Sequence, residues 1–181
     1  MKTFFIADCH FGHDKIIPMC HRPFTDAKEM QEEMIRKWNA KVSNEDLVYM
    51  LGDFSFKINK HDTTKILEQL NGRKILIKGN HDRYAGHPDF DRFFEGICET
   101  KQLHIGDKEF FLSHYPIIDY PGAYRNGYMI YGHVHNQYVP YERMYCVSVE
   151  CINYEPVTFE EIVDIYKDKE MQERVSWLKP F

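Results

Sequence analysis

Three short apolar runs alternate with two amphipathic segments in the first half of this sequence, and this alternation limits the possible folds more than any other feature. The runs at 3–7, 47–51 and 74–78 are each bounded by turn-forming residues, which favours buried strands over helices. Between them, the segments 26–41 and 62–70 repeat apolar residues at helical spacing. This β-α-β-α-β order predicts a parallel sheet covered by helices, because such crossovers are almost always right-handed.

The second half of the chain has a different pattern, with short apolar runs but no long amphipathic segment between them. Four strands are expected there, over 99–105, 109–113, 128–131 and 144–149. The dipeptide Gly106-Asp107 suits a two-residue hairpin turn, so we expect this half to be largely antiparallel. Thr158 and Glu161 form a capping box that begins a C-terminal helix, which is expected to run towards Trp177.

The length and composition favour one globular domain over residues 1–181, with 43% hydrophobic residues and a mass of 21.7 kDa. A chain of this length buries roughly 70% of its unfolded surface, so a bound metal would serve function rather than folding. Five cysteines without a C-x-x-C pair argue against a disulfide framework and a cysteine zinc site. The apolar run before Asp8 is too short for a signal-peptide core, and no later run is long enough to span a membrane. We therefore expect a cytoplasmic protein without membrane contact.

Residues that can bind metal follow five of the expected strands, at the end where ligands collect in open α/β sheets. In chain order they are Asp8-Cys9-His10, Gly52-Asp53, Gly79-Asn80-His81-Asp82, His114 and Gly132-His133-Val134-His135. Alternate residues leaving a strand point the same way, which would bring both members of each D-x-H or H-x-H set to one centre. Oxygen and nitrogen donors without thiolates suit manganese, iron, nickel, cobalt or zinc rather than calcium.

Taken together and in this order, the sets resemble the five motifs of the calcineurin-like metallophosphoesterase superfamily: D-x-H, G-D, G-N-H-D/E, H and G-H-x-H. The resemblance covers residues 8–135. The stretches around Asp8-Cys-His10-Phe-Gly-His13 and Gly-Asn-His-Asp82 are similar to those of small bacterial and phage phosphoesterases. The family fold that this implies is α/β, with two mixed β-sheets packed face to face and helices outside, a four-layer αββα sandwich.

The resemblance also implies two divalent metal ions and assigns a role to each motif residue. Asp8, His10 and His135 would hold one ion, Asn80, His114 and His133 the other, and Asp53 would bridge them. In such a centre, a water bridging the ions attacks phosphorus, and His81 would protonate the departing oxygen as general acid. Many family members continue the second motif as G-D-x-x-D, whose last Asp orients the catalytic histidine, but this chain has Phe56 at that position. What orients His81 is therefore open at this point.

Two further residues are candidates for binding substrate. His13 follows His10 after a glycine, and the loop between them can fold back over the metals and bring His13 to the scissile phosphate; otherwise it is a surface histidine. Arg125, between the last two motifs, can form a fork onto phosphate oxygens; otherwise it is a solvated arginine.

These observations predict a two-metal phosphoesterase acting on small phosphodiesters, nucleotide-like or cyclic, or on phosphomonoesters. A protein phosphatase is disfavoured because the longer motif G-D-x-V-D-R-G is absent. A nuclease shares all five motifs, but 23 basic against 28 acidic residues give a net charge of −5, which suits nucleic-acid binding poorly. A non-catalytic protein-interaction scaffold on the same fold is the other alternative, and the presence of His81 argues against it.

Overall fold

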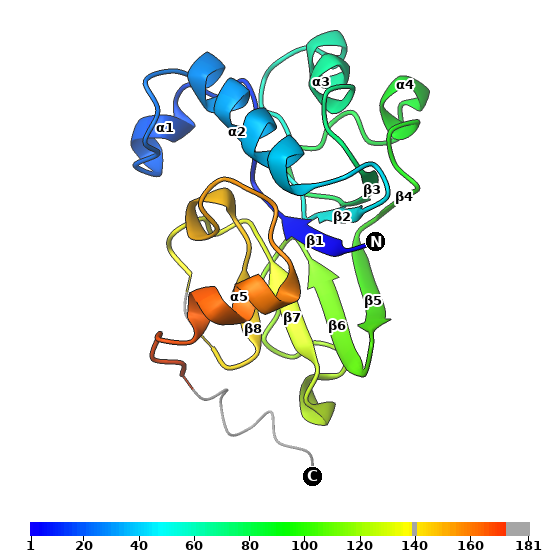
Figure 1. Ribbon diagram of the computed structural model, residues 1–181, viewed down its shortest axis with the longest axis vertical. Helices are drawn as coiled ribbons and strands as arrows, with labels where there is room; N and C mark the ends of the chain where they lie inside the picture. Colours follow the sequence, from blue (N-terminus) through cyan, green and yellow to red (C-terminus); the bar gives the residue numbers. More distant parts are fainter. Residues whose placement is uncertain (139–140, 173–181) are drawn as a thin grey trace.

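The computed structural model describes residues 1–138 and 141–172, and the two halves of the sequence form two separate four-stranded sheets (Figure 1). The first sheet has the order β1 (Thr3–Ile6), β2 (Leu47–Met50), β3 (Arg73–Ile77) and β4 (Gly96–Cys98). The second has the order β5 (Thr100–Ile105), β6 (Lys108–Ser113), β7 (Tyr128–Tyr131) and β8 (Met144–Cys146). The predicted architecture of two sheets with helices is confirmed.

All strands of the first sheet are parallel, as the β-α-β-α-β order predicts. In the second sheet only β5 and β6 are antiparallel; β6 pairs with β7, and β7 with β8, in parallel. The expectation of a largely antiparallel second half is therefore wrong. The connecting segments 114–127 and 132–143 are long enough to bring the chain back to the end of the sheet at which the previous strand began, which parallel pairing requires. Apolar periodicity gives no information on strand direction. The two-residue turn at Gly106 is confirmed, since Ile105 faces Lys108 across the hairpin.

Five α-helices connect or flank the strands of the described chain. They are α1 (Ile16–Met19), α2 (Ala27–Lys41), α3 (Lys60–Leu67), α4 (Pro88–Asp91) and α5 (Phe159–Tyr166). α2 begins after Asp26, whose side chain accepts a hydrogen bond from the backbone N–H of Glu29 at 2.8 Å. α5 has the predicted capping box but ends at Tyr166, and Trp177 lies outside the described residues. α1, α4 and β4 were not predicted, because three or four residues are too few to show a period.

The two sheets share one apolar core. Phe5 of β1 and Phe110 of β6 stack with their ring centroids 6.2 Å apart. Phe159 at the start of α5 packs edge-on against Phe110 and Tyr128, so this helix covers the second sheet (Figure 1). α2 contributes three fully buried side chains on the first sheet, namely Met30, Met34 and Trp38. No helix in the described part of the chain is both long enough and apolar enough to cross a membrane.

Candidate functional site

The metal-capable residues predicted from sequence follow β1, β2, β3, β6 and β7, and they meet beside a cavity of about 640 Å³. The cavity is lined by residues from four of the five motifs, namely His10, Asp53, Asn80, His81, His133 and His135. Asp8 and His114 are fully buried beneath them. The side chains form two donor groups, and within each group the ligand atoms lie within 4.8 Å of one another.

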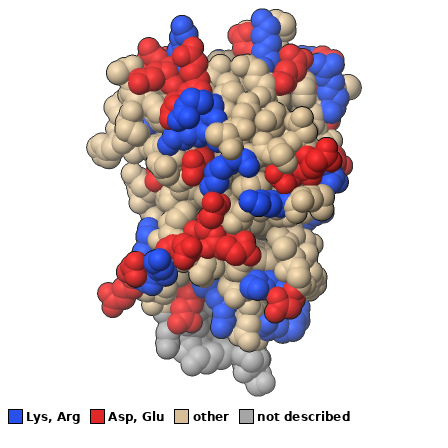
Figure 2. Space-filling model, in the orientation of Figure 1, with Lys and Arg blue, Asp and Glu red and all other residues tan. Residues whose placement is uncertain are grey.

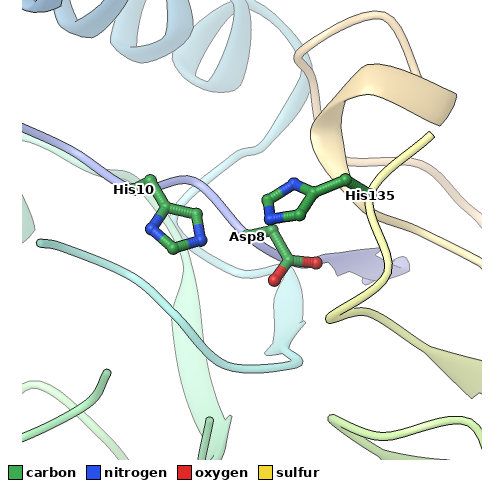
Figure 3. A group of neighbouring side chains, drawn as sticks. All are labelled: Asp8, His10 and His135. Atoms are coloured by element: carbon green, nitrogen blue, oxygen red, sulfur yellow. The ribbon is translucent and has the colours of Figure 1, made fainter. Parts of the chain in front are cut away.

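The first donor group is Asp8, His10 and His135, which converge from β1 and from the segment after β7 (Figure 3). One carboxylate oxygen of Asp8, Oδ2, accepts hydrogen bonds from the backbone N–H of His133 (2.8 Å) and from Ser148 Oγ (2.6 Å). The other oxygen, Oδ1, is buried without a hydrogen-bond partner among the described residues. Burial raises the pKa of Asp8 to about 6.

His10 has both ring nitrogens buried, and neither has a hydrogen-bond partner in the described part of the chain. Burial, together with the positive charge of His135 and Arg22, lowers the pKa of His10 to about 2. The ring is therefore neutral at physiological pH and carries a lone pair. Buried polar atoms without partners are rare in folded proteins, and those of Asp8 and His10 face the same space.

The second donor group is Asp53, His114 and His133, with Asn80 beside it. His114 Nδ1 lies 2.8 Å from the carbonyl oxygen of Leu51, which only accepts, so Nδ1 carries a proton and Nε2 faces the centre. Nε2 lies 3.1 Å from the amide oxygen of Asn80, 3.2 Å from Nδ1 of His133 and 3.6 Å from a carboxylate oxygen of Asp53. Nitrogen and oxygen atoms of four residues thus converge, and these are the atoms that bind divalent cations.

Asp53 joins the two groups. Its Oδ2 lies 3.5 Å from Nε2 of His10 in the first group and 3.6 Å from Nε2 of His114 in the second. Its Oδ1 accepts the backbone N–H of His81 at 2.8 Å. One carboxylate therefore faces both groups, as expected for a residue shared between two ions.

The donor residues have an unusual backbone, and this corrects the expectation that strand alternation brings them together. Five of them have positive φ angles, namely Asp8 (58°), His10 (50°), Asp53 (55°), His133 (71°) and His135 (51°). Strands β1, β2 and β7 end before these residues, so left-handed turns aim the side chains at the centre. Asp and His adopt this conformation more readily than most residues, and it still carries strain of the kind found at functional sites.

Two glycines allow the strand ends to approach this closely. A Cβ atom at Gly79 would lie 2.2 Å from Oδ1 of Asp53, and one at Gly132 would lie 2.6 Å from Oδ2 of Asp8. Any side chain at either position would displace a carboxylate of the site. The G-N-H-D and G-H-x-H motifs thus need their glycines for space.

A buried chain of charged groups supports the first donor group. Nδ1 of His135 lies 3.0 Å from Oε1 of Glu150, so the imidazole is held by a carboxylate on the side away from the centre. Glu150 also pairs with Arg22 at 2.7 Å, and Arg22 donates to the backbone carbonyls of Asp8 and Cys9. Sequence reasoning missed Arg22, Glu150 and Ser148, because none lies in a motif; the one signal was that Glu150 and Ser148 follow a short strand.

Asp82, the last residue of the G-N-H-D motif, joins two loops of the site. Its carboxylate accepts hydrogen bonds from the backbone N–H groups of Asp53 (2.9 Å), Phe54 (3.0 Å) and Gly79 (2.8 Å). It therefore holds the G-D loop against the G-N-H-D loop and does not contact the ring of His81.

His81 is partly exposed and lines the cavity, with Nε2 3.9 Å from Oδ2 of Asp53. Its ring meets Phe56 edge to face, with centroids 4.7 Å apart. Phe56 also stacks on His13, with centroids 3.9 Å apart. In place of a carboxylate, an aromatic ring thus contacts the ring of His81, and the hydrogen bond to Asp53 fixes its backbone.

The two candidate substrate-binding residues lie in different places. His13 lines the cavity, and burial lowers its pKa to about 4. Arg125 is not among the described residues that line the cavity. Its guanidinium group is largely exposed and lies 3.3 Å from Glu109. The structure therefore gives no support to Arg125 as a phosphate-binding residue, whereas the role of His13 stays a prediction.

Residues 1–152 match the family model of the calcineurin-like phosphoesterase superfamily domain. An uncharacterized protein of Methanocaldococcus jannaschii is 34% identical over 172 residues, which cover 91% of this chain and 90% of that protein. The gene 66 protein of Mycobacterium phage L5 is 26% identical over 136 residues, which cover 65% of this chain and 64% of the phage protein.

Two solved structures have a similar fold. A protein of unknown function from Aquifex aeolicus has a TM-score of 0.69 and 28% identity, covering 90% of this chain and 98% of that one. A protein described as a novel archaeal phosphodiesterase has a TM-score of 0.53 and 21% identity, covering 90% of this chain and 96% of that one, which supports the fold alone. The family match over most of the chain and the archaeal relative together show that this protein belongs to the calcineurin-like phosphoesterase superfamily.

Proposed function

We propose that this protein hydrolyses small phosphate esters, phosphodiesters in preference to phosphomonoesters, with two divalent ions drawn from manganese, iron, nickel, cobalt and zinc. The observation that carries the proposal is the pair of oxygen and nitrogen donor groups joined by Asp53 at an open cavity. The unpartnered buried atoms of Asp8 and His10 fit a bound cation, and so do the nitrogen and oxygen atoms that converge around His114.

When bound, a pair of divalent ions supplies a water of lowered pKa and neutralises the charge of a phosphate group. Asp8, His10 and His135 would hold one ion, Asn80, His114 and His133 the other, and Asp53 both. His81 would hold a proton at Nε2 for the leaving oxygen, since its ring faces the cavity and its backbone is fixed by Asp53. Phe56 packs edge to face against that ring.

Small diesters are favoured over other substrates by shape and charge. The cavity of about 640 Å³ has room for a second ester arm beyond the donor groups. Acidic and basic side chains are interspersed over the face drawn in Figure 2, and the net charge is −5, so a long polyanion finds no broad basic track there. The similarly folded archaeal protein is described as a phosphodiesterase, which is consistent with the proposal.

The test is a metal screen with two chromogenic substrates. Protein stripped of metal and reloaded with each of the five ions is assayed on bis(p-nitrophenyl) phosphate and on p-nitrophenyl phosphate, and metal content is measured in the same samples. We expect hydrolysis of the diester in proportion to occupancy by two ions. Absence of hydrolysis of both substrates at full occupancy would overturn the phosphoesterase proposal, and faster hydrolysis of the monoester would overturn the preference for diesters.

A further inference from the structure

Besides the donor groups, the cavity is lined by residues at α1 and in the loop after β2, and we call this part of the cavity the arm. This arm is lined by two lysines, Lys15 and Lys57, and by three apolar side chains, Ile16, Met19 and Phe56. Met19 is 67% exposed, which is unusual for a large apolar side chain at the edge of a cavity. The arm therefore combines positive charge with an apolar wall, in contrast to the carboxylates and imidazoles of the donor groups.

The two lysine charges in this arm are not neutralised by the protein. Neither ammonium group forms an ion pair within residues 1–138 and 141–172. Among the described residues, the carboxylate that lines this part of the cavity is that of Asp14, which accepts the backbone N–H of Ala27 at the start of α2 at 2.8 Å. That bond and the positive end of the helix dipole stabilise the charge of Asp14 without removing it. Two lysines against this one carboxylate still leave an excess of positive charge in the arm.

The position of Lys57 is fixed by the backbone of two loops that pack together. The backbone N–H of Phe56 donates to the carbonyl of Phe11 at 3.0 Å, and a Cβ atom at Gly12 would lie 2.2 Å from the side chain of Ile58. Lys57 itself has a φ of 57°, and its ammonium group lies 5.0 Å from the centroid of the Phe56 ring. A strained backbone held in this way presents the side chain at the cavity.

We propose that this arm binds a second, non-scissile anionic group of the substrate, with Lys15 and Lys57 as its ligands. The inference rests on the proposed function, because the donor groups take the scissile phosphate. A cavity of about 640 Å³ holds a molecule much larger than one phosphate group. The apolar wall of Ile16, Met19 and Phe56 would contact the uncharged part between the two anionic groups. The substrate class is thus a diester that carries a further phosphate, as in a nucleoside bisphosphate ester.

The test uses two substrates that differ only in that second group. Thymidine 5′-(p-nitrophenyl phosphate) is compared with the same compound carrying a 3′-phosphate, and release of nitrophenolate reports hydrolysis of the same bond in both. We expect the 3′-phosphate to raise kcat/KM by up to about fivefold, the effect of one partly exposed charge pair. This ratio should fall towards one in Lys57→Gln and in Lys15→Gln, and it should be retained in Lys57→Arg.

Lys28→Gln is the matched control, since Lys28 is an exposed lysine of α2 that does not line the cavity, and the substitution changes the net charge equally. Binding of thymidine 3′,5′-bisphosphate and thymidine 5′-monophosphate, measured by calorimetry, gives a readout that does not need turnover. Equal kcat/KM for both substrates, or equal loss in the Lys28 control, would overturn the inference while leaving the phosphoesterase function intact. Preferential binding of the bisphosphate without hydrolysis would support the inference and overturn the function.

Discussion

The two donor groups of the candidate centre are built on the same motifs but are supported in different ways. In the first group, buried side chains hold the ligands: Ser148 binds Asp8, and Glu150 with Arg22 holds His135. In the second group, the backbone carbonyl of Leu51 orients His114, whereas Asn80 is exposed. If ions bind as we propose, we therefore expect the first group to be organised before an ion binds, and the second to be completed by the ion.

Solvent contact differs in the same direction. The most buried donors of each group, Asp8 and His10 in the first and Asp53 and His114 in the second, are at most 3% exposed, whereas Asn80 beside the second group is exposed. Preorganised ligands lose less entropy on binding, and burial strengthens the attraction between a carboxylate and a cation. We therefore expect the first group to bind its ion more tightly than the second, and the following predictions test or refine this difference.

The largest effect is expected from Asp53→Ala, because Asp53 faces both donor groups. Its loss should weaken metal binding at both groups, whatever the difference in affinity between them. Loss of a residue that only hydrogen-bonds a metal ligand reduces metal affinity by about 10–100-fold. Loss of Asp53 should reduce the affinity at both positions by more than this. Metal analysis after dialysis is the measurement, and His104→Ala, an exposed change on β5, is the control. Full two-ion occupancy in Asp53→Ala would contradict the bridging role; Asp53→Asn guards against misfolding, since it keeps an acceptor for His81.

The next effect concerns His81, which belongs to neither donor group. His81→Ala should keep both ions and lose about 10²- to 10⁴-fold in kcat on diesters with alkyl or ribose leaving groups. Nitrophenolate is already a stable anion, so the loss on a nitrophenyl diester should be far smaller. Rates on both substrates at saturating metal are the measurement, and equal losses on the two would indicate that His81 binds metal or phosphate instead.

Glu150→Gln should sharpen the contrast between the groups. It removes the carboxylate behind His135, so affinity at the first group should fall about 10–100-fold while the second group is unchanged. Two-site metal titration by calorimetry measures this. Glu155→Gln is a control, because Glu155 pairs with Lys41 at the surface. If the metal affinity of both groups falls equally in Glu150→Gln, the contact between Glu150 and His135 does not make the first group bind its ion more tightly than the second.

The smallest effect is a pH dependence specific to the first group. Asp8 and His135 must each lose a proton to bind metal. The pKa of Asp8 is about 6, and burial lowers the pKa of His135 but Glu150 and Asp8 raise it by more, so affinity should fall by up to about tenfold per pH unit for each of the two side chains as it becomes protonated. His10, with a pKa of about 2, stays neutral over this range and does not contribute. In metal-free protein the sign reverses: the folded state binds the Asp8 proton more tightly than the unfolded chain, so this group stabilises the fold on acidification from about pH 6.

Asp8→Asn provides the comparison for both statements. In metal-free form, its melting temperature should fall more steeply than that of the unmodified protein between pH 6 and 4, because the contribution of His10 is then no longer offset. Parallel melting curves over this range would show that the proton on Asp8 carries no stability.

Much of this architecture could be predicted from sequence, because strand ends and metal-capable residues coincide in the motifs. The ranges of β1, β2, β3 and α2 follow from apolar periodicity and turn residues to within a residue or so. The direction of β7 and β8 could not be predicted, since it depends on where two long connections return the chain. The positive φ angles of the donor residues depend on contacts between loops, such as those of Asp82, that no local pattern encodes.

The candidate site was only partly predictable for a related reason. Motif spacing brings the seven proposed ligands together, because the carboxyl ends of neighbouring strands meet. Arg22 lies outside every motif and reaches Asp8 and Glu150 only after the chain has folded, so sequence gives no signal for it. The sequence shows Phe56 at the position of the last Asp of G-D-x-x-D. Its contact with the ring of His81, however, follows from the packing of two loops.

The left-handed backbone at five donor residues should affect how stable the protein is in a cell and how fast it is degraded. Each such residue is less stable than an ordinary turn by about 1 kcal/mol or more, and a domain of this size has only about 5–15 kcal/mol of stability in total. Ions that bind the folded form alone offset this strain by mass action. Under metal starvation we therefore expect proteases to degrade the chain faster, so that its abundance follows the supply of its ions.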